Sequence, residues 1–278
     1  MSVQGWRYYN HAMIPEGQPN TEPDLKPIES GEIWADVHGG TPLLARWIND
    51  WDCGYETNWW YVIKDEPFDL SRLKAKRRYE INKGIKSFDV KRIQPKDYME
   101  EIYSVQVAAF ADYPEKYRPK VGHDAFLKSL AGWDEGIVYG AFCRESGELA
   151  GYALLYPNGD FWLEFSVLKT KPSFEKQGVN AAIVAKILES NRHFLEECGV
   201  ICDGARSINH ETHFQDYLEK YFGFRRAYCK LRILYNPKIA WLIKILYPLR
   251  KMLLKFDWSG MLHQVNAVLK MEAIVRSQ

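Results

Sequence analysis

One loop of this sequence has the composition of a phosphate-binding site. The pattern predicts an apolar strand over 161–168 and a helix over 181–197, and the loop between them contains Gly178. A strand that opens into a helix through such a loop offers unpaired backbone N–H groups and the positive end of the helix dipole. Both features suit a pyrophosphate, so we expect this loop to hold a cofactor.

Glu164 is a candidate general base. It interrupts the predicted strand 161–168 among aromatic residues, where partial burial would raise its pKa to a value useful for catalysis. A second interpretation, in which Glu164 lies at the strand edge and points to water, stays open.

A basic segment lies upstream of this strand. Between Lys74 and Arg92 there are eight cations and two acids, enough to bind nucleotide phosphates or a tRNA acceptor stem electrostatically. On a helical projection Arg77 falls within the apolar stripe. We therefore expect Arg77 either to extend to the edge of the stripe or to enter a cleft and bind an anion of the substrate.

Asn209 and His210 follow the predicted strand 199–207 at its carboxyl end, where they could line the substrate side of a cleft. The spacing of His210 and His213 is His-x-x-His, not the His-Glu-x-x-His of zinc enzymes, and no third ligand is evident. We therefore expect no metal site. The sequence also contains no nucleophile elbow, P-loop or dinucleotide fingerprint.

The second half of the chain resembles a GNAT-superfamily acyltransferase. Strand, phosphate loop, helix, strand, helix and a Gly-Phe turn follow one another in that superfamily's order, and Tyr217-Leu-Glu-Lys-Tyr-Phe-Gly-Phe224 resembles its closing helix. The whole element order predicts an α+β fold with a mixed sheet flanked by helices. The resemblance implies transfer of an acyl group from acetyl-CoA, or from another acyl-CoA, to an amine.

The resemblance also implies site residues. The superfamily's loop, Gln/Arg-x-x-Gly-x-Gly/Ala, matches Glu175-Lys-Gln-Gly178-Val-Asn180, of which only the central glycine is kept. The acid that protonates the leaving thiolate is commonly a tyrosine on the last helix, which implies Tyr217, with Tyr221 as the alternative. The cofactor pyrophosphate would contact six residues: Lys176, Gln177, Gly178, Val179, Asn180 and Ala181.

A second resemblance lies in Leu73-Lys-Ala-Lys-Arg-Arg-Tyr-Glu-Ile-Asn-Lys-Gly-Ile-Lys86 and the strand 88–93. The segment is similar to the Arg-Arg-x-Ile-x-Lys-x-x-Lys helix of FemAB-like transferases. These use the same fold, doubled, to pass amino acids from aminoacyl-tRNA to cell-wall precursors. The two resemblances imply a small-molecule or cell-envelope-precursor amine as acceptor, with tRNA as a partner only if the chain is FemAB-like. Because Glu175 and Asn180 depart from the loop pattern, a catalytically silent binding protein is a third alternative.

Composition sets the outer limits of these hypotheses. A chain of 278 residues that is 46% hydrophobic can bury one large core or two modest ones. Lys and Arg total 37 against 36 Asp and Glu, so no overall charge favours a polyanionic partner. Five scattered cysteines, with no Cys-x-x-Cys pair, and an amino terminus without a signal-peptide pattern predict a cytoplasmic location.

We expect three parts: a β-rich subdomain over 1–93 that ends in the basic helix, a GNAT-like domain over 94–236, and a basic amphipathic helical tail over 237–278. The tail holds seven Lys or Arg against Asp257 and Glu272. It either packs as a helical hairpin turned at Pro248, or lies in a membrane interface with its lysines near anionic lipid. We expect the packed hairpin. The lysines of the membrane alternative are Lys244, Lys251 and Lys255.

Overall fold

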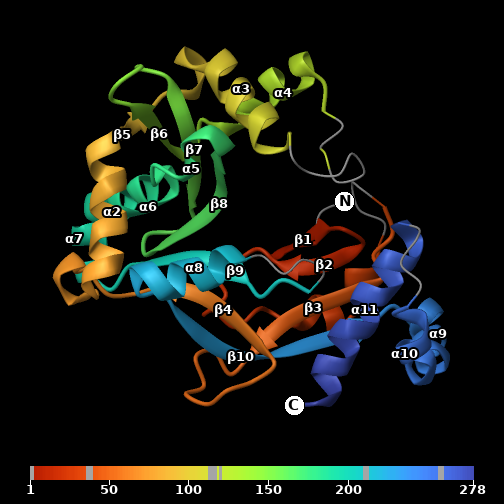
Figure 1. The fold of residues 1–278 in the computed structure, drawn as a ribbon. Coiled ribbons are helices and arrows are strands. Elements are labelled where there is room, and N and C mark those ends of the chain that lie inside the picture. The colour runs from red at the N-terminus through yellow and green to blue at the C-terminus, as the bar shows by residue number, and fades with distance from the viewer. Residues whose placement is uncertain (1–2, 36–39, 112–117, 119–120, 209–212, 256–259) are drawn as a thin grey trace. The chain divides into compact units, whose positions relative to one another are not determined.

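The chain forms two compact units. The computed structural model describes residues 3–35, 40–111, 118, 121–208, 213–255 and 260–278. The central unit comprises Ile63–Gly204 and Phe214–Arg225, and the terminal unit comprises Met1–Val62, Ala205–His213 and Arg226–Gln278. Figure 1 gives the labels of the helices and strands.

The central unit contains a mixed sheet with the strand order β9-β8-β7-β6-β5. Its strands are β5 (Phe88–Ile93), β6 (Ile137–Cys143), β7 (Leu149–Pro157), β8 (Trp162–Thr170) and β9 (Val200–Ala205). The pairs from β5 to β8 are antiparallel, whereas β8 and β9 are parallel. A parallel pair needs a crossover connection, and helix α6 (Val179–Ser190) supplies it.

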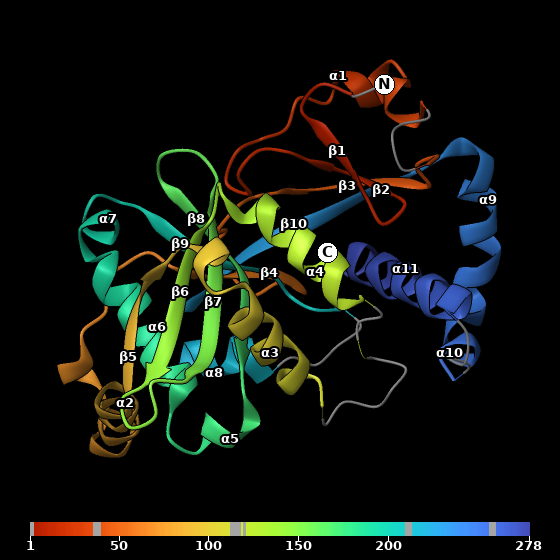
Figure 2. The same cartoon turned by 90° about the horizontal axis from the view of Figure 1, so that it is seen from above.

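Helices cover both faces of this sheet (Figures 1 and 2). On one face, α3 (Met99–Ala109) and α4 (His123–Leu130) pack their apolar residues against β6 and β7. On the other face lie α6, eight of whose twelve residues are buried, and α2 (Ala75–Ser87), which packs on α6. The remaining helices of this unit are α5 (Pro172–Glu175), α7 (Arg192–Glu196) and α8 (His213–Phe222).

The terminal unit has strands in the order β1-β2-β3-β10-β4. These are β1 (Trp6–Tyr9), β2 (Ala12–Pro15), β3 (Leu44–Asn49), β10 (Arg225–Tyr235) and β4 (Trp59–Lys64). The pair β2 and β3 is parallel, whereas β1 and β2, like β3 and β10, are antiparallel. Its helices are α1 (Lys26–Glu29), α9 (Pro237–Leu246), α10 (Arg250–Leu253) and α11 (Gly260–Arg276). Single turns of 3-10 helix occur in the two units at Glu32–Trp34, Leu70–Arg72, Pro95–Asp97, Ala131–Trp133 and Tyr247–Leu249.

The predicted α+β class, with a mixed sheet flanked by helices, is confirmed. The GNAT-like order from the strand β8 through α6, β9 and α8 to β10 is also present. Strand β5 begins and ends at the predicted residues. Among the described residues, no helix combines the length and the apolar character that are needed to cross a bilayer.

Two details of the prediction are wrong. The helix expected over 181–197 is broken into α6 and α7 at Asn191, whose φ of −108° and ψ of 20° depart from helical values and whose side-chain amide donates to the carbonyl oxygen of Ile187 at 2.8 Å. Pro248 does not separate two arms of a hairpin. It lies early in the 3-10 turn Tyr247–Leu249, where a missing N–H costs little, and α10 follows directly.

Candidate functional site

Strands β8 and β9 separate partway along their length. Their parallel pairing ends with Glu164 opposite Cys202, although both strands continue. On its other side β8 carries a bulge at Ser166, where the register with β7 shifts between Leu154 and Leu155. A bulge bends its strand, which accounts for the divergence of β8 from β9. We call residues 165–170 and 203–204 the β8–β9 fork.

Asp203 lies in the fork, one residue past the last paired position of β9. Burial raises the pKa of its carboxyl to about 7, against a smaller opposing effect of the hydrogen bond from Gln215 of α8. Such a carboxyl is partly ionised at neutral pH and can accept a proton from a substrate. Asp203 is therefore suited to act as a general base.

Glu164 lies on the opposite face of the sheet from Asp203, because side chains alternate along β9 and Glu164 is level with Cys202. Glu164 is half-buried, and its Oε1 accepts a hydrogen bond from Nδ2 of Asn158 at 3.1 Å. Its role as a base stays a prediction. Sequence reasoning missed Asp203, although the feature that singled out Glu164, an acid within an apolar strand, is present there too.

The loop before α6 turns at Gly178, which has a φ of 88° and caps the helix. The side chains of Val179 and Ala181 are buried, and Oδ1 of Asn180 accepts a hydrogen bond from Oγ1 of Thr170 at 3.1 Å. This segment therefore offers an anion the backbone N–H groups at the start of α6 rather than its side chains. The other two predicted cofactor contacts are the exposed Lys176 and the half-buried Gln177.

Helix α2 packs directly on this loop. A methyl group at Gly84 would overlap the carbonyl oxygen of Gly178 and lie 3.1 Å from the backbone nitrogen of Ala182. Nζ of Lys83 donates to the carbonyl oxygen of Lys176 at 2.8 Å. The glycine that the sequence resemblance assigns to a pyrophosphate is thus in contact with a helix, and the role of residues 176–181 in cofactor binding stays a prediction.

Arg77 contacts the carboxyl end of α8. Its guanidinium donates a hydrogen bond to the carbonyl oxygen of Lys220 and lies 5.6 Å from the ring centroid of Tyr221. A cation at a helix carboxyl end is stabilised by the helix dipole. Arg77 thus has a structural partner within the central unit, and its contact with a substrate stays a prediction.

Tyr217 belongs to an aromatic cluster on α8. Its ring centroid lies 5.0 Å from that of Tyr221, 5.6 Å from that of Phe222 and 6.1 Å from that of Phe214. Burial raises its pKa above the ordinary value, and the charge of Glu80 on α2 adds to the shift. Tyr217 is therefore protonated at neutral pH, as a proton donor must be.

The predicted residues fall into separate places. The structure brings Arg77 of α2 together with the tyrosines of α8, and Phe214 links Tyr217 to the fork through a ring contact with Phe165 at 5.8 Å. Asn209 and His210 lie outside the described residues. No group of three or more His, Cys, Asp or Glu side chains in the described part of the chain could hold a metal ion.

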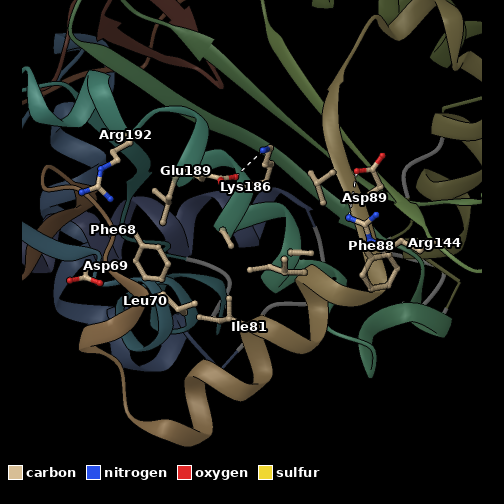
Figure 3. Close-up of a pocket in the computed structure, with 15 residues that line it drawn as sticks. Phe68, Asp69, Leu70, Ile81, Phe88, Asp89, Arg144, Lys186, Glu189 and Arg192 are labelled. Atoms are coloured by element: carbon tan, nitrogen blue, oxygen red, sulfur yellow. Dashed lines mark hydrogen bonds and ion pairs between the residues drawn. The ribbon is translucent and has the colours of Figure 1, made fainter.

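A pocket of about 410 Å³ lies between α2, β5 and α6 (Figure 3). Its apolar lining includes Phe68, Leu70 and Ile81, and charged side chains stand at its rim. At the rim, Nζ of Lys186 forms an ion pair with Oε2 of Glu189 at 2.8 Å. None of the predicted site residues lines this pocket.

The sequence matches no protein-family model and no curated protein. Among solved structures, the C-terminal domain of a predicted lysylphosphatidylglycerol synthetase from Agrobacterium fabrum aligns with a TM-score of 0.50 and 12% identity, over 87% of this chain and 84% of that chain. L-PGS from Bacillus licheniformis aligns with a TM-score of 0.49 and 12% identity, over 87% and 83%. FemX aligns with a TM-score of 0.47 and 9% identity, over 66% and 63%. The chain shares the fold of the first of these proteins.

Proposed function

We propose that the chain is a transferase that moves an acyl group onto an amine at the β8–β9 fork. The observation that carries this proposal is the position of Asp203, a half-buried carboxyl at the point where the two strands separate, whose pKa is raised to about 7. An amine is protonated at neutral pH and must lose a proton before it attacks a carbonyl carbon. Asp203 accepts that proton.

The leaving group needs a proton in return. Tyr217 is protonated at neutral pH, and the ring of Phe214 connects it to the fork residue Phe165. We assign to Tyr217 the protonation of the leaving thiolate or oxyanion. Glu164, on the other face of β8, is the second candidate for the base.

Two classes of donor fit this chemistry, and each has an observation in its favour. The backbone N–H groups at the start of α6 suit the pyrophosphate of an acyl-CoA. The exposed cations of α2 suit the phosphates of an aminoacyl-tRNA. They include Lys76 and Lys86, and the exposed Lys74 directly precedes the helix.

The packing of α2 favours the second donor. A pyrophosphate approaches a loop most closely where glycine leaves room, yet the backbone of α2 already lies 3.2 Å from the position that a side chain at Gly178 would take. A domain of the same fold bears the name of an enzyme that attaches lysine to phosphatidylglycerol. We therefore place aminoacyl-tRNA ahead of acetyl-CoA, with an amine of a small molecule or a cell-envelope precursor as acceptor.

A thermal-shift series with acetyl-CoA, longer acyl-CoAs, free CoA, aminoacyl-tRNA and uncharged tRNA tests the choice of donor. A ligand at 100 times its dissociation constant adds about 2.7 kcal/mol of stability. We expect the charged tRNA to raise the melting temperature. A shift with the CoA compounds alone would instead assign the donor to that class.

A further inference from the structure

Helices α9 and α10 expose a stripe of large apolar side chains. Trp241 is 59% exposed, Ile245 55%, Leu249 45% and Met252 52%. Trp241 and Ile245 are four residues apart in α9, which places their side chains on one face of that helix. Leu249 and Met252 continue the spacing into the 3-10 turn and α10. Ile243, at two residues from both Trp241 and Ile245, is only 7% exposed. The buried side of α9 is therefore opposite to the apolar stripe.

The orientation of α9 is held by contacts within the terminal unit. Asn236 is buried, and its side chain accepts a hydrogen bond from the backbone of Lys238, which caps the helix. The same side chain donates to the carbonyl oxygen of Pro42 at 3.0 Å. The indole N–H of Trp241 donates to the carbonyl oxygen of Lys238 at 2.9 Å, so its ring can enter an apolar medium without losing a hydrogen bond.

Cations accompany the stripe. Lys244, Lys251 and Lys255 are exposed. The segment from residue 237 to residue 255 contains no Asp or Glu. A second copy of this surface would bring like charges together. A surface that is negatively charged and has an apolar layer beneath the charges would instead complement it.

We propose that α9 and α10 bind the interface of an anionic lipid bilayer, with the apolar stripe between the headgroups and the lysines at the phosphates. Helix α9 is ten residues long, far shorter than a spanning helix, so the segment lies along the membrane surface. Ile243 of α9 and Leu269 and Met271 of α11 are buried, as a packed tail requires, but the apolar stripe on the other side of α9 is exposed. The inference does not depend on the proposed acyl transfer, since it rests on this surface alone.

Sedimentation of the full chain with vesicles tests the proposal. Vesicles of phosphatidylcholine alone are compared with vesicles that also contain phosphatidylglycerol, at low and high salt. We expect binding only to the anionic vesicles and weaker binding at high salt, because the attraction is screened.

Variants test the contributions of the lysines and of the apolar stripe separately. The triple change Lys244→Gln, Lys251→Gln and Lys255→Gln should weaken binding to anionic vesicles on the order of 100-fold. Ile245→Ser should weaken it about 10-fold or more with an unchanged melting temperature. A matched triple of exposed lysines at other sites should bind as the unaltered chain does. It consists of Lys26→Gln, Lys96→Gln and Lys128→Gln.

Three results would overturn the proposal. One is equal binding to both kinds of vesicle or to neither. Another is an equal loss of binding in the matched triple. The third is a concentration-dependent dimer that Ile245→Ser dissociates, in a chain that does not sediment with vesicles, which would assign the stripe to a second copy.

Discussion

Gly84 of α2 lies against Gly178 at the start of α6, so closely that a methyl group at Gly84 would overlap the carbonyl oxygen of Gly178. Two segments that are far apart in the sequence thus approach through glycines on both sides. Two features require glycine at position 178: the close approach of Gly84, and a φ of 88°, which other residues rarely adopt. The glycine of the predicted phosphate loop consequently has a structural role whatever the loop binds.

Gly84→Ala should therefore destabilise the chain by about 1–3 kcal/mol, as overpacking does. In an ordinary helix interior the same change is stabilising by roughly 0.5–1 kcal/mol. Urea unfolding measures the difference. Gly132→Ala is the matched control, because a side chain there meets no atom within 4 Å, and a stabilised Gly84→Ala variant would contradict the close packing.

Asp203 should make the stability of the chain depend on pH. Its pKa rises from 3.8 to about 7 on folding, so between these values the folded chain holds a proton that the unfolded chain has released. The free energy of unfolding therefore falls as the pH rises through this window and levels off above about pH 7.

Asp203→Asn removes this dependence. At about pH 8 the melting temperature of the variant should lie a few °C above that of the unaltered chain, because each kcal/mol of added stability raises it by roughly 2–4 °C. At about pH 4 the two melting temperatures should be nearly equal. Melting curves across the pH range measure the effect. A difference between the two proteins that does not change with pH would show that Asp203 keeps an ordinary pKa.

Arg77→Gln should lower stability by about 0.3–1 kcal/mol, because a cation is lost from the carboxyl end of α8. Arg77→Lys keeps the charge and should restore part of the loss. The two variants also test the predicted substrate contact. If Arg77 also binds the donor, Arg77→Gln weakens donor binding in addition to lowering the urea midpoint.

Tyr217→Phe should reduce the rate of transfer by roughly 10²-fold and leave the affinity for the donor nearly unchanged, if this hydroxyl protonates the leaving group. Tyr221→Phe is the matched control, since its ring lies 5.0 Å from that of Tyr217 on the same helix. Full turnover by a folded Tyr217→Phe variant would remove Tyr217 from the mechanism. Loss of turnover in Tyr221→Phe alone would transfer the role to Tyr221.

The elements of this fold were predictable from sequence because their patterns are local. Strand β5 alternates between buried and exposed residues, and α8 has an apolar face at helical spacing. The break at Asn191 was not predictable, because the non-helical backbone angles of a single residue leave no mark in the periodicity.

The site was less predictable because its chemistry depends on contacts across the fold. In the sequence Asp203 resembles any acid in a short strand, and its raised pKa depends on burial in the folded chain. Arg77 could extend to solvent or meet an anion, and its contact with the carbonyl oxygen of Lys220 depends on the packing of α2 against α8. The need for glycine at position 84 was not predictable, because only the close approach of Gly178 in the folded chain requires it.

The pH dependence of acyl transfer tests the proposed role of Asp203 as the general base. The chain is incubated with aminoacyl-tRNA or acetyl-CoA and a simple primary amine, and the amide product is measured across the pH range for the unaltered chain and for Asp203→Asn. We expect a product whose rate of formation rises as the pH passes through about 7, and a rate that is roughly 10²-fold lower in the variant. Absence of product with either donor, or an Asp203→Asn variant with an unchanged rate and pH profile, would contradict the proposal.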